Sequence, residues 1–216
     1  FLRKPAAQQM GRWDLEPMEK AKHSEKNGNH GDAANHWIEY GRISLLMAKH
    51  EEALSAFRNA NHQALINYNK EKECACSIYT LGQTAYWLGY YEYTKKNFSG
   101  ASYFWDLYLK LSIKYQQLSH GDPLGPAEVS YALNNMGTLE RDQGRIESAM
   151  KYFEESAELK LSAISISKEK GALTLEYVDT LSWITSMKES KGLFAEAEKE
   201  YASHLQILKK MTAIQG

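Results

Sequence analysis

The stretch Tyr131–Phe153, with the sequence YALNNMGTLERDQGRIESAMKYF, contains the pattern that decides the fold. In its first half, Leu133 and Met136 are three residues apart, and Gly137 follows one residue later, so the three positions share one face of a helix. Gly144 marks a short break, after which a second apolar stripe begins and leads to Phe153. Two helices joined by a tight turn form an antiparallel hairpin.

The same pattern recurs every 48 residues along the chain. One position of each repeat is alanine: Ala53, Ala101, Ala149 and Ala197. Four residues later each repeat has an aromatic residue: Phe57, Trp105, Phe153 and Tyr201. Twelve residues before the alanine the repeats have Gly41, Gly89, Gly137 and Thr185. We interpret the small residues as places where two helices approach closely and the aromatic residue as filler between hairpins, which then stack into a solenoid.

This pattern resembles the tetratricopeptide repeat (TPR) family, whose W-x-x-L-G unit is matched by Trp37, Tyr40 and Gly41. The third repeat is particularly similar to the long-repeat class of kinesin light chains and bacterial signalling proteins. The period of 48 exceeds the family's usual value of about 34, which predicts longer helices. Ala48 and Lys96 replace the turn glycine in the first two repeats. The resemblance implies an all-α fold, a right-handed superhelical solenoid of about four antiparallel helix hairpins.

The expected organisation has three parts. Residues 1–16 have no periodicity and are predicted to be a linker or lead-in, and residues 17–31 a short helix and turn. The TPR-like solenoid covers residues 32–216, with repeats that start near 34, 82, 130 and 178. Its helices are expected at 32–48, 51–68, 71–95, 98–119, 126–142, 146–168, 173–190 and 194–212.

Composition and motifs argue against several function classes. The 26 Lys and Arg residues balance 27 Asp and Glu residues, whereas a nucleic-acid binder normally shows a basic excess. The chain has no phosphate-binding loop and no hydrolase or metalloprotease motif. We therefore expect no enzyme, no nucleic-acid partner and no cofactor. No apolar run reaches the roughly 18–20 residues of a membrane span, so we expect no membrane insertion and a cytoplasmic location.

The seven histidines are scattered, and we expect no metal site. Cys74 and Cys76 are predicted to lie on a helix, where residues two apart point to different faces. We therefore expect them to be two small, separate side chains in a reducing compartment.

The resemblance implies a concave groove lined by the first helix of each hairpin. Carrying the family's groove-facing positions onto this sequence, we select Arg42, Tyr86, Tyr90, Tyr93, Tyr131, Asn134 and Arg141 as candidates for binding a partner. Three of them, Tyr86, Tyr90 and Tyr93, form a stripe on one helix of the aromatic-rich second repeat. Trp87 and Tyr91 form an adjacent stripe on the same helix. Two interpretations stay open: the tyrosine stripe lines the groove, or it is packing material between long helices.

We expect a protein- or peptide-binding scaffold or regulatory module, part of a larger bacterial signalling or regulatory protein. One alternative is a peptide-pheromone or small-ligand sensor domain. Another is a homo-oligomerisation module that forms a homodimer through an end of the array. An apolar patch on the last helix would favour this second alternative; its residues are Leu205, Ile207, Leu208 and Met211.

Overall fold

The structure, a computed structural model, describes residues 14–214, and every regular element in that range is an α-helix. The chain divides into two compact units, Phe1–Lys95 and Lys96–Gly216, which we describe separately. The expected all-helical repeat fold is confirmed. The lead-in predicted over residues 1–16 lies mostly outside the described residues.

The first unit contains four helices among its described residues: α1 (Glu16–Lys26), α2 (His30–Leu46), α3 (His50–Lys70) and α4 (Ala75–Thr94). Within this unit, consecutive helices from α1 to α4 pack on each other, and α2 also contacts α4. Pro17 lies in the first turn of α1, where a missing N–H costs nothing. Trp37 and Tyr40 of α2 pack with Ala56 and Ala60 of α3 in the core of this unit.

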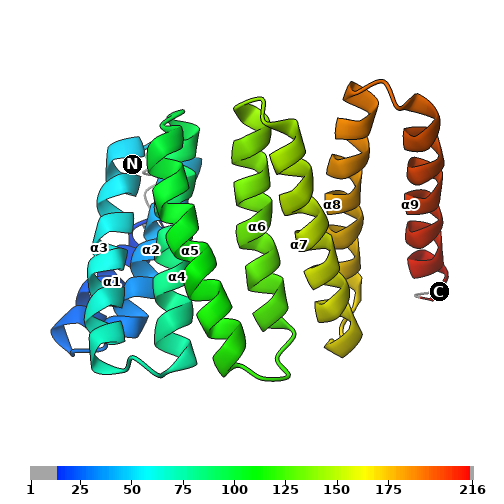
Figure 1. The fold of residues 1–216 in the computed structure, drawn as a ribbon. Helices are drawn as coiled ribbons and strands as arrows, with labels where there is room; N and C mark the ends of the chain where they lie inside the picture. Colours follow the sequence, from blue (N-terminus) through cyan, green and yellow to red (C-terminus); the bar gives the residue numbers. More distant parts are fainter. Residues whose placement is uncertain (1–13, 215–216) are drawn as a thin grey trace, which may run out of the picture. The chain divides into compact units, whose positions relative to one another are not determined.

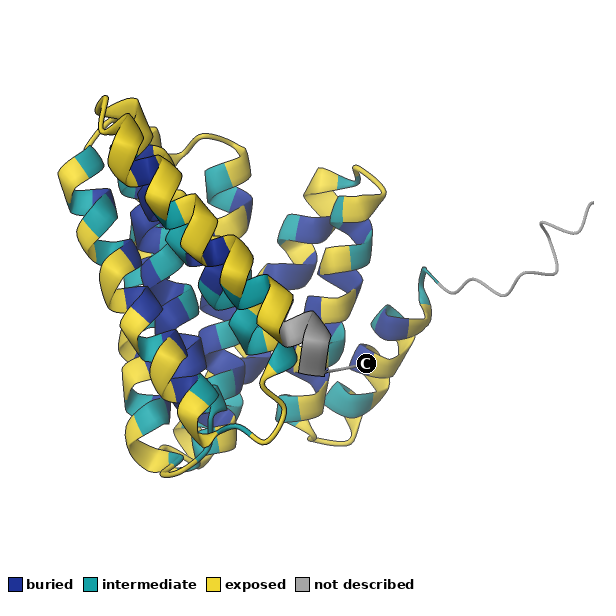
Figure 2. Cartoon of the chain, turned by 90° about the vertical axis from the view of Figure 1, so that its right-hand side faces the viewer, coloured by how far each residue is buried: buried dark blue, intermediate teal, exposed yellow. Residues whose placement is uncertain are grey.

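The second unit contains α5 (Phe98–Leu118), α6 (Leu124–Asp142), α7 (Ile146–Ile166), α8 (Gly171–Ser190) and α9 (Phe194–Ile214). Within this unit, consecutive helices from α5 to α9 pack against each other and run in opposite directions (Figure 1). Phe153 and Ala149 of α7 pack against Ile184 and Met187 of α8. Along the helices, buried residues alternate with exposed ones, as the periodicity predicts (Figure 2).

Small residues create the expected close helix contacts. A Cβ atom added at Gly41 would lie 2.4 Å from the ring of Phe57, and one at Gly137 would lie 3.1 Å from the ring of Phe153. Phe57 and Phe153 are buried, and so are the four repeat alanines. Tyr201 differs, because 38% of it is exposed. Its helix α9 packs on α8, and no further helix follows among the described residues to cover the ring.

The turn that follows the first helix of each repeat has the same backbone conformation every 48 residues. The second residue after the helix is left-handed, with φ of 57° at Ala48, 57° at Lys96, 77° at Gly144 and 82° at Gly192. The next N–H closes the turn: Lys49 donates to the carbonyl of Ser44 at 2.8 Å, and Arg145 donates to that of Glu140 at 2.9 Å. This is the Schellman arrangement that ends many helices.

Two details differ from the sequence-based expectation. The helix predicted from residue 71 begins at Ala75, after a connection in which Cys74 has extended backbone angles. The second predicted hairpin is also divided, since α4 ends the first unit and α5 begins the second.

Candidate functional site

Four of the seven predicted groove residues lie on α2 and α4 of the first unit, and Arg42, Tyr86 and Tyr90 gather around Trp87. The guanidinium of Arg42 lies 5.2 Å from the ring centre of Trp87. The rings of Tyr86 and Tyr90 are stacked with centres 6.4 Å apart, and the Trp87 ring meets the Tyr90 ring edge-on at 5.6 Å. We call Arg42, Tyr86, Trp87 and Tyr90 the aromatic–arginine patch.

Burial differs along the two aromatic stripes of α4, and Trp87 is half-buried. Tyr91 is a core residue with 5% exposure, and its burial raises the pKa of the phenol. Tyr90 is 37% exposed, while Tyr86 and Tyr93 are half-buried. The ring of Trp87 stacks on the buried ring of Phe57, with ring centres 5.6 Å apart. This contact attaches the aromatic–arginine patch to the core of the unit. Trp87 was not among the predicted residues because it lies outside the groove-facing positions carried over from the family.

The other three predicted residues lie on α6 of the second unit. The Tyr131 hydroxyl donates to the Glu176 carboxylate at 2.7 Å, and the Asn134 amide donates to the Thr180 hydroxyl at 3.2 Å. Both bonds join α6 to α8. The Arg141 guanidinium lies 4.5 Å from the ring centre of Trp183, also on α8. The predicted residues thus form two groups, one in each unit.

A buried lysine supports the second group and was missed by the sequence analysis. Lys160 of α7 is only 2% exposed, and its ammonium donates to the Thr180 hydroxyl at 2.8 Å and to the Glu176 carbonyl at 3.3 Å. It also lies 5.5 Å from the ring centre of Tyr131. Burial lowers the pKa of Lys160 to about 8, although the nearby carboxylates of Glu176 and Asp179 act in the opposite direction.

The Lys160 network occupies part of the surface that the sequence assigned to a ligand. Tyr131 and Asn134 use their hydrogen bonds to hold α6 against α8. The carbonyl oxygen of the Asn134 side chain is buried and has no hydrogen-bond partner among the described residues. Tyr131 and Asn134 therefore contribute mainly to helix packing. The aromatic–arginine patch differs, because its Arg42 and Tyr90 are exposed.

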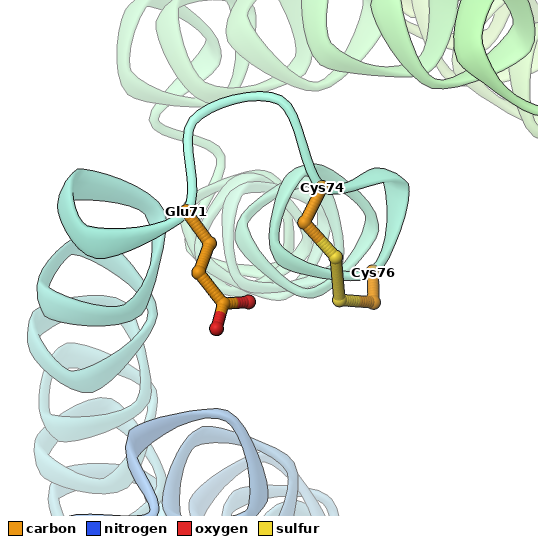
Figure 3. A group of neighbouring side chains, drawn as sticks. All are labelled: Glu71, Cys74 and Cys76. Atoms are coloured by element: carbon orange, nitrogen blue, oxygen red, sulfur yellow. A yellow bond between two sulfur atoms is a disulfide. The ribbon is translucent and has the colours of Figure 1, made fainter.

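Cys74 and Cys76 correct a prediction. They form a disulfide, with Cα atoms 5.3 Å apart, instead of pointing to different faces of a helix. Cys74 is the N-cap of α4 and has extended angles, φ −78° and ψ 123°, so only Cys76 has helical geometry. The Glu71 carboxylate lies beside the pair (Figure 3).

No protein-family model matches this chain, and no curated protein matches it. Among solved structures, it is similar to the crystal structure of BtubC (BKLC) from P. vanneervenii, with a TM-score of 0.55. The two chains are 12% identical, and the match covers 97% of this chain and 93% of that chain. Identity this low shows the fold alone, which is a helical repeat fold. Assignment to the tetratricopeptide family stays a prediction.

None of the described helices combines the length and the apolar character that crossing a membrane requires.

Proposed function

We propose that this chain is a protein- or peptide-binding module without catalytic activity, part of a larger signalling or regulatory protein in the cytoplasm. The aromatic–arginine patch carries the proposal. Trp, Tyr and Arg are the residue types that contribute most to binding energy at protein interfaces. Here all three meet on a surface built by two packed helices, α2 and α4.

The patch suits an extended peptide with an apolar side chain and a nearby carboxylate. The faces of Tyr86 and Tyr90 offer apolar area, and their hydroxyls can bond to a peptide backbone. Arg42 is exposed, so its guanidinium can reach a carboxylate or a carbonyl of the ligand. The contact between Trp87 and Phe57 holds the patch in place before binding, which reduces the ordering cost.

A peptide library displayed on phage and selected against the whole chain tests the proposal. Selected peptides should bind with a Kd that weakens about 30-fold or more in the double variant Tyr86→Ala/Tyr90→Ala, because interface hot spots contribute about 2 kcal/mol or more. Tyr103→Ala removes an exposed tyrosine elsewhere, on α5, and should leave the Kd unchanged. Unaltered affinity in a double variant with a native circular dichroism spectrum would refute the patch as the site.

Self-association through α9 is a second candidate function. Leu205 is 51% exposed, which favours this candidate, while Ile207 and Leu208 are half-buried. The side chain of Met211 lies outside the described residues. Sedimentation velocity over a wide concentration range tests the candidate, and a monomer at every concentration would exclude it. The small-ligand sensor stays a prediction with no observation that favours it.

A further inference from the structure

The connection between α3 and α4 brings three potential metal ligands together. The Glu71 carboxylate and the sulfur atoms of Cys74 and Cys76 all lie within 4.8 Å of one another (Figure 3). Helix α3 ends at Lys70 and α4 begins at Ala75, so the chain reverses over four residues and Glu71 faces the pair. Cys74 is half-buried, while Glu71 and Cys76 are exposed.

Hydrogen bonds hold this turn without help from the disulfide. The Glu71 carbonyl accepts from the Cys74 N–H at 3.1 Å and from the Ser77 hydroxyl at 2.5 Å. The Cys74 carbonyl accepts from the same hydroxyl at 2.9 Å and from the Ile78 N–H at 3.2 Å. Ser77 is fully buried. The three ligands should therefore stay close together when the sulfur–sulfur bond is cleaved.

The chemistry of these groups matches a thiophilic divalent cation. Both cysteines lie at the N-terminus of α4, where the exposed backbone N–H groups and the helix dipole favour negatively charged groups such as thiolates. Zinc-class ions bind thiolate and carboxylate ligands in tetrahedral sites, and three protein ligands leave one position open. The exposure of Cys76 and Glu71 gives an ion a path from solvent.

We propose that reduction converts this disulfide into a binding site for a zinc-class cation, with Cys74, Cys76 and Glu71 as ligands. A dithiol reductant transfers two electrons and two protons to the disulfide and becomes a disulfide itself. The cation then displaces the two thiol protons and binds both thiolates. In the oxidised chain the sulfur atoms are bonded to each other and provide no thiolate, so cation binding depends on the redox state.

Titration of the intact chain with Cd²⁺ alone tests the proposal. The chain is reduced with a dithiol, freed of it without oxygen and checked for two thiols. The reduced chain should then bind one equivalent of Cd²⁺ and develop a thiolate-to-metal absorption band. The oxidised chain should bind no Cd²⁺ at this site. Glu71→Gln should weaken binding about tenfold or more. Glu73→Gln, which removes a neighbouring exposed carboxylate outside the cluster, should not.

Three results would overturn the proposed site. One is a reduced chain with two free thiols that gives no absorption band. Another is equal binding by the variant Cys74→Ser/Cys76→Ser. The third is equal affinity of Glu71→Gln and Glu73→Gln, which would exclude the carboxylate ligand.

Discussion

At the scale of single residues, the ring of Phe57 fills the space directly against Gly41. Phe57 is fully buried and its ring stacks on Trp87, so a methyl group added at Gly41 would force the ring or the helices to shift. The glycine is therefore required by a contact between α2 and α3 rather than by its backbone angles.

Gly41→Ala should lower the free energy of unfolding by up to about 2 kcal/mol. Overpacking costs about 1–3 kcal/mol, and the better helix propensity of alanine returns about 1 kcal/mol. Urea denaturation of both proteins measures the difference. Gly31→Ala is the control, because the nearest atom to its new Cβ is the end of the Asn67 side chain at 3.3 Å. If the loss stays as large in a Phe57→Leu background, the ring is not its cause.

Lys160 is the residue that should make stability depend on pH. Its folded pKa of about 8 lies below the ordinary value of 10.5, so between these values the unfolded chain binds a proton that the folded chain does not. Stability therefore rises with pH over this window. Relative to Lys160→Met, the natural chain should gain on the order of 2 kcal/mol between pH 7 and pH 9.5. Urea midpoints of both proteins at the two pH values measure this gain, and parallel pH profiles would contradict it.

At the scale of elements, the turn after the first helix of each repeat depends on one left-handed residue. Ala48 and Lys96 adopt this conformation at φ 57° without the freedom of glycine. A side chain in the left-handed region costs about 1–2 kcal/mol. The hydrogen bonds that close the turn, such as that from Lys49 to Ser44, offset this cost at Ala48.

Ala48→Gly should therefore stabilise the protein by about 0.5–1 kcal/mol, and Gly144→Ala should destabilise it by about 1 kcal/mol. Ala202→Gly, on the exposed surface of α9, is the opposing control and should cost about 1 kcal/mol of helix propensity. Thermal and urea unfolding measure all three. Destabilisation by Ala48→Gly would show that the left-handed conformation costs less than the chain entropy that glycine adds.

Helices were the elements that the sequence predicted best, because buried positions at helical spacing recur every 48 residues. The start of α4 was missed, since no proline or glycine marks the extended Cys74. This error also hid the disulfide, which requires one cysteine outside the helix. Lys160 was missed because a helical lysine is normally exposed, and only the packing of α6, α7 and α8 buries it. The sequence places Tyr90 and Trp87 on two adjacent stripes of one helix. It does not show which of the two is more exposed, because exposure depends on the position of α2 and α3.

At the scale of the whole molecule, the chain consists of two compact units that meet in sequence between Lys95 and Lys96. In each unit, helices mainly contact their neighbours along the chain. Proteins of this kind have a stability that sums over neighbouring elements, so a local change affects nearby helices most. The repeat period does not reveal the division, since it continues across Lys96 without interruption.

Ala149→Leu should therefore act within the second unit. Ala149 has no exposed surface and packs beside Phe153 and Met187, so the larger side chain should cost about 1–3 kcal/mol. Native-state hydrogen exchange should accelerate in α6, α7 and α8, by about tenfold for each 1.4 kcal/mol.

Amides of α2 and α3 should keep their exchange rates within about twofold, because they belong to the other unit. Ala202→Leu makes the same substitution at an exposed position and should leave exchange in α6–α8 unchanged. Equal acceleration in α2 and α7 would show that the two units unfold as one. Unchanged exchange throughout would contradict the close helix contact at Ala149, and with it the alignment of the repeats.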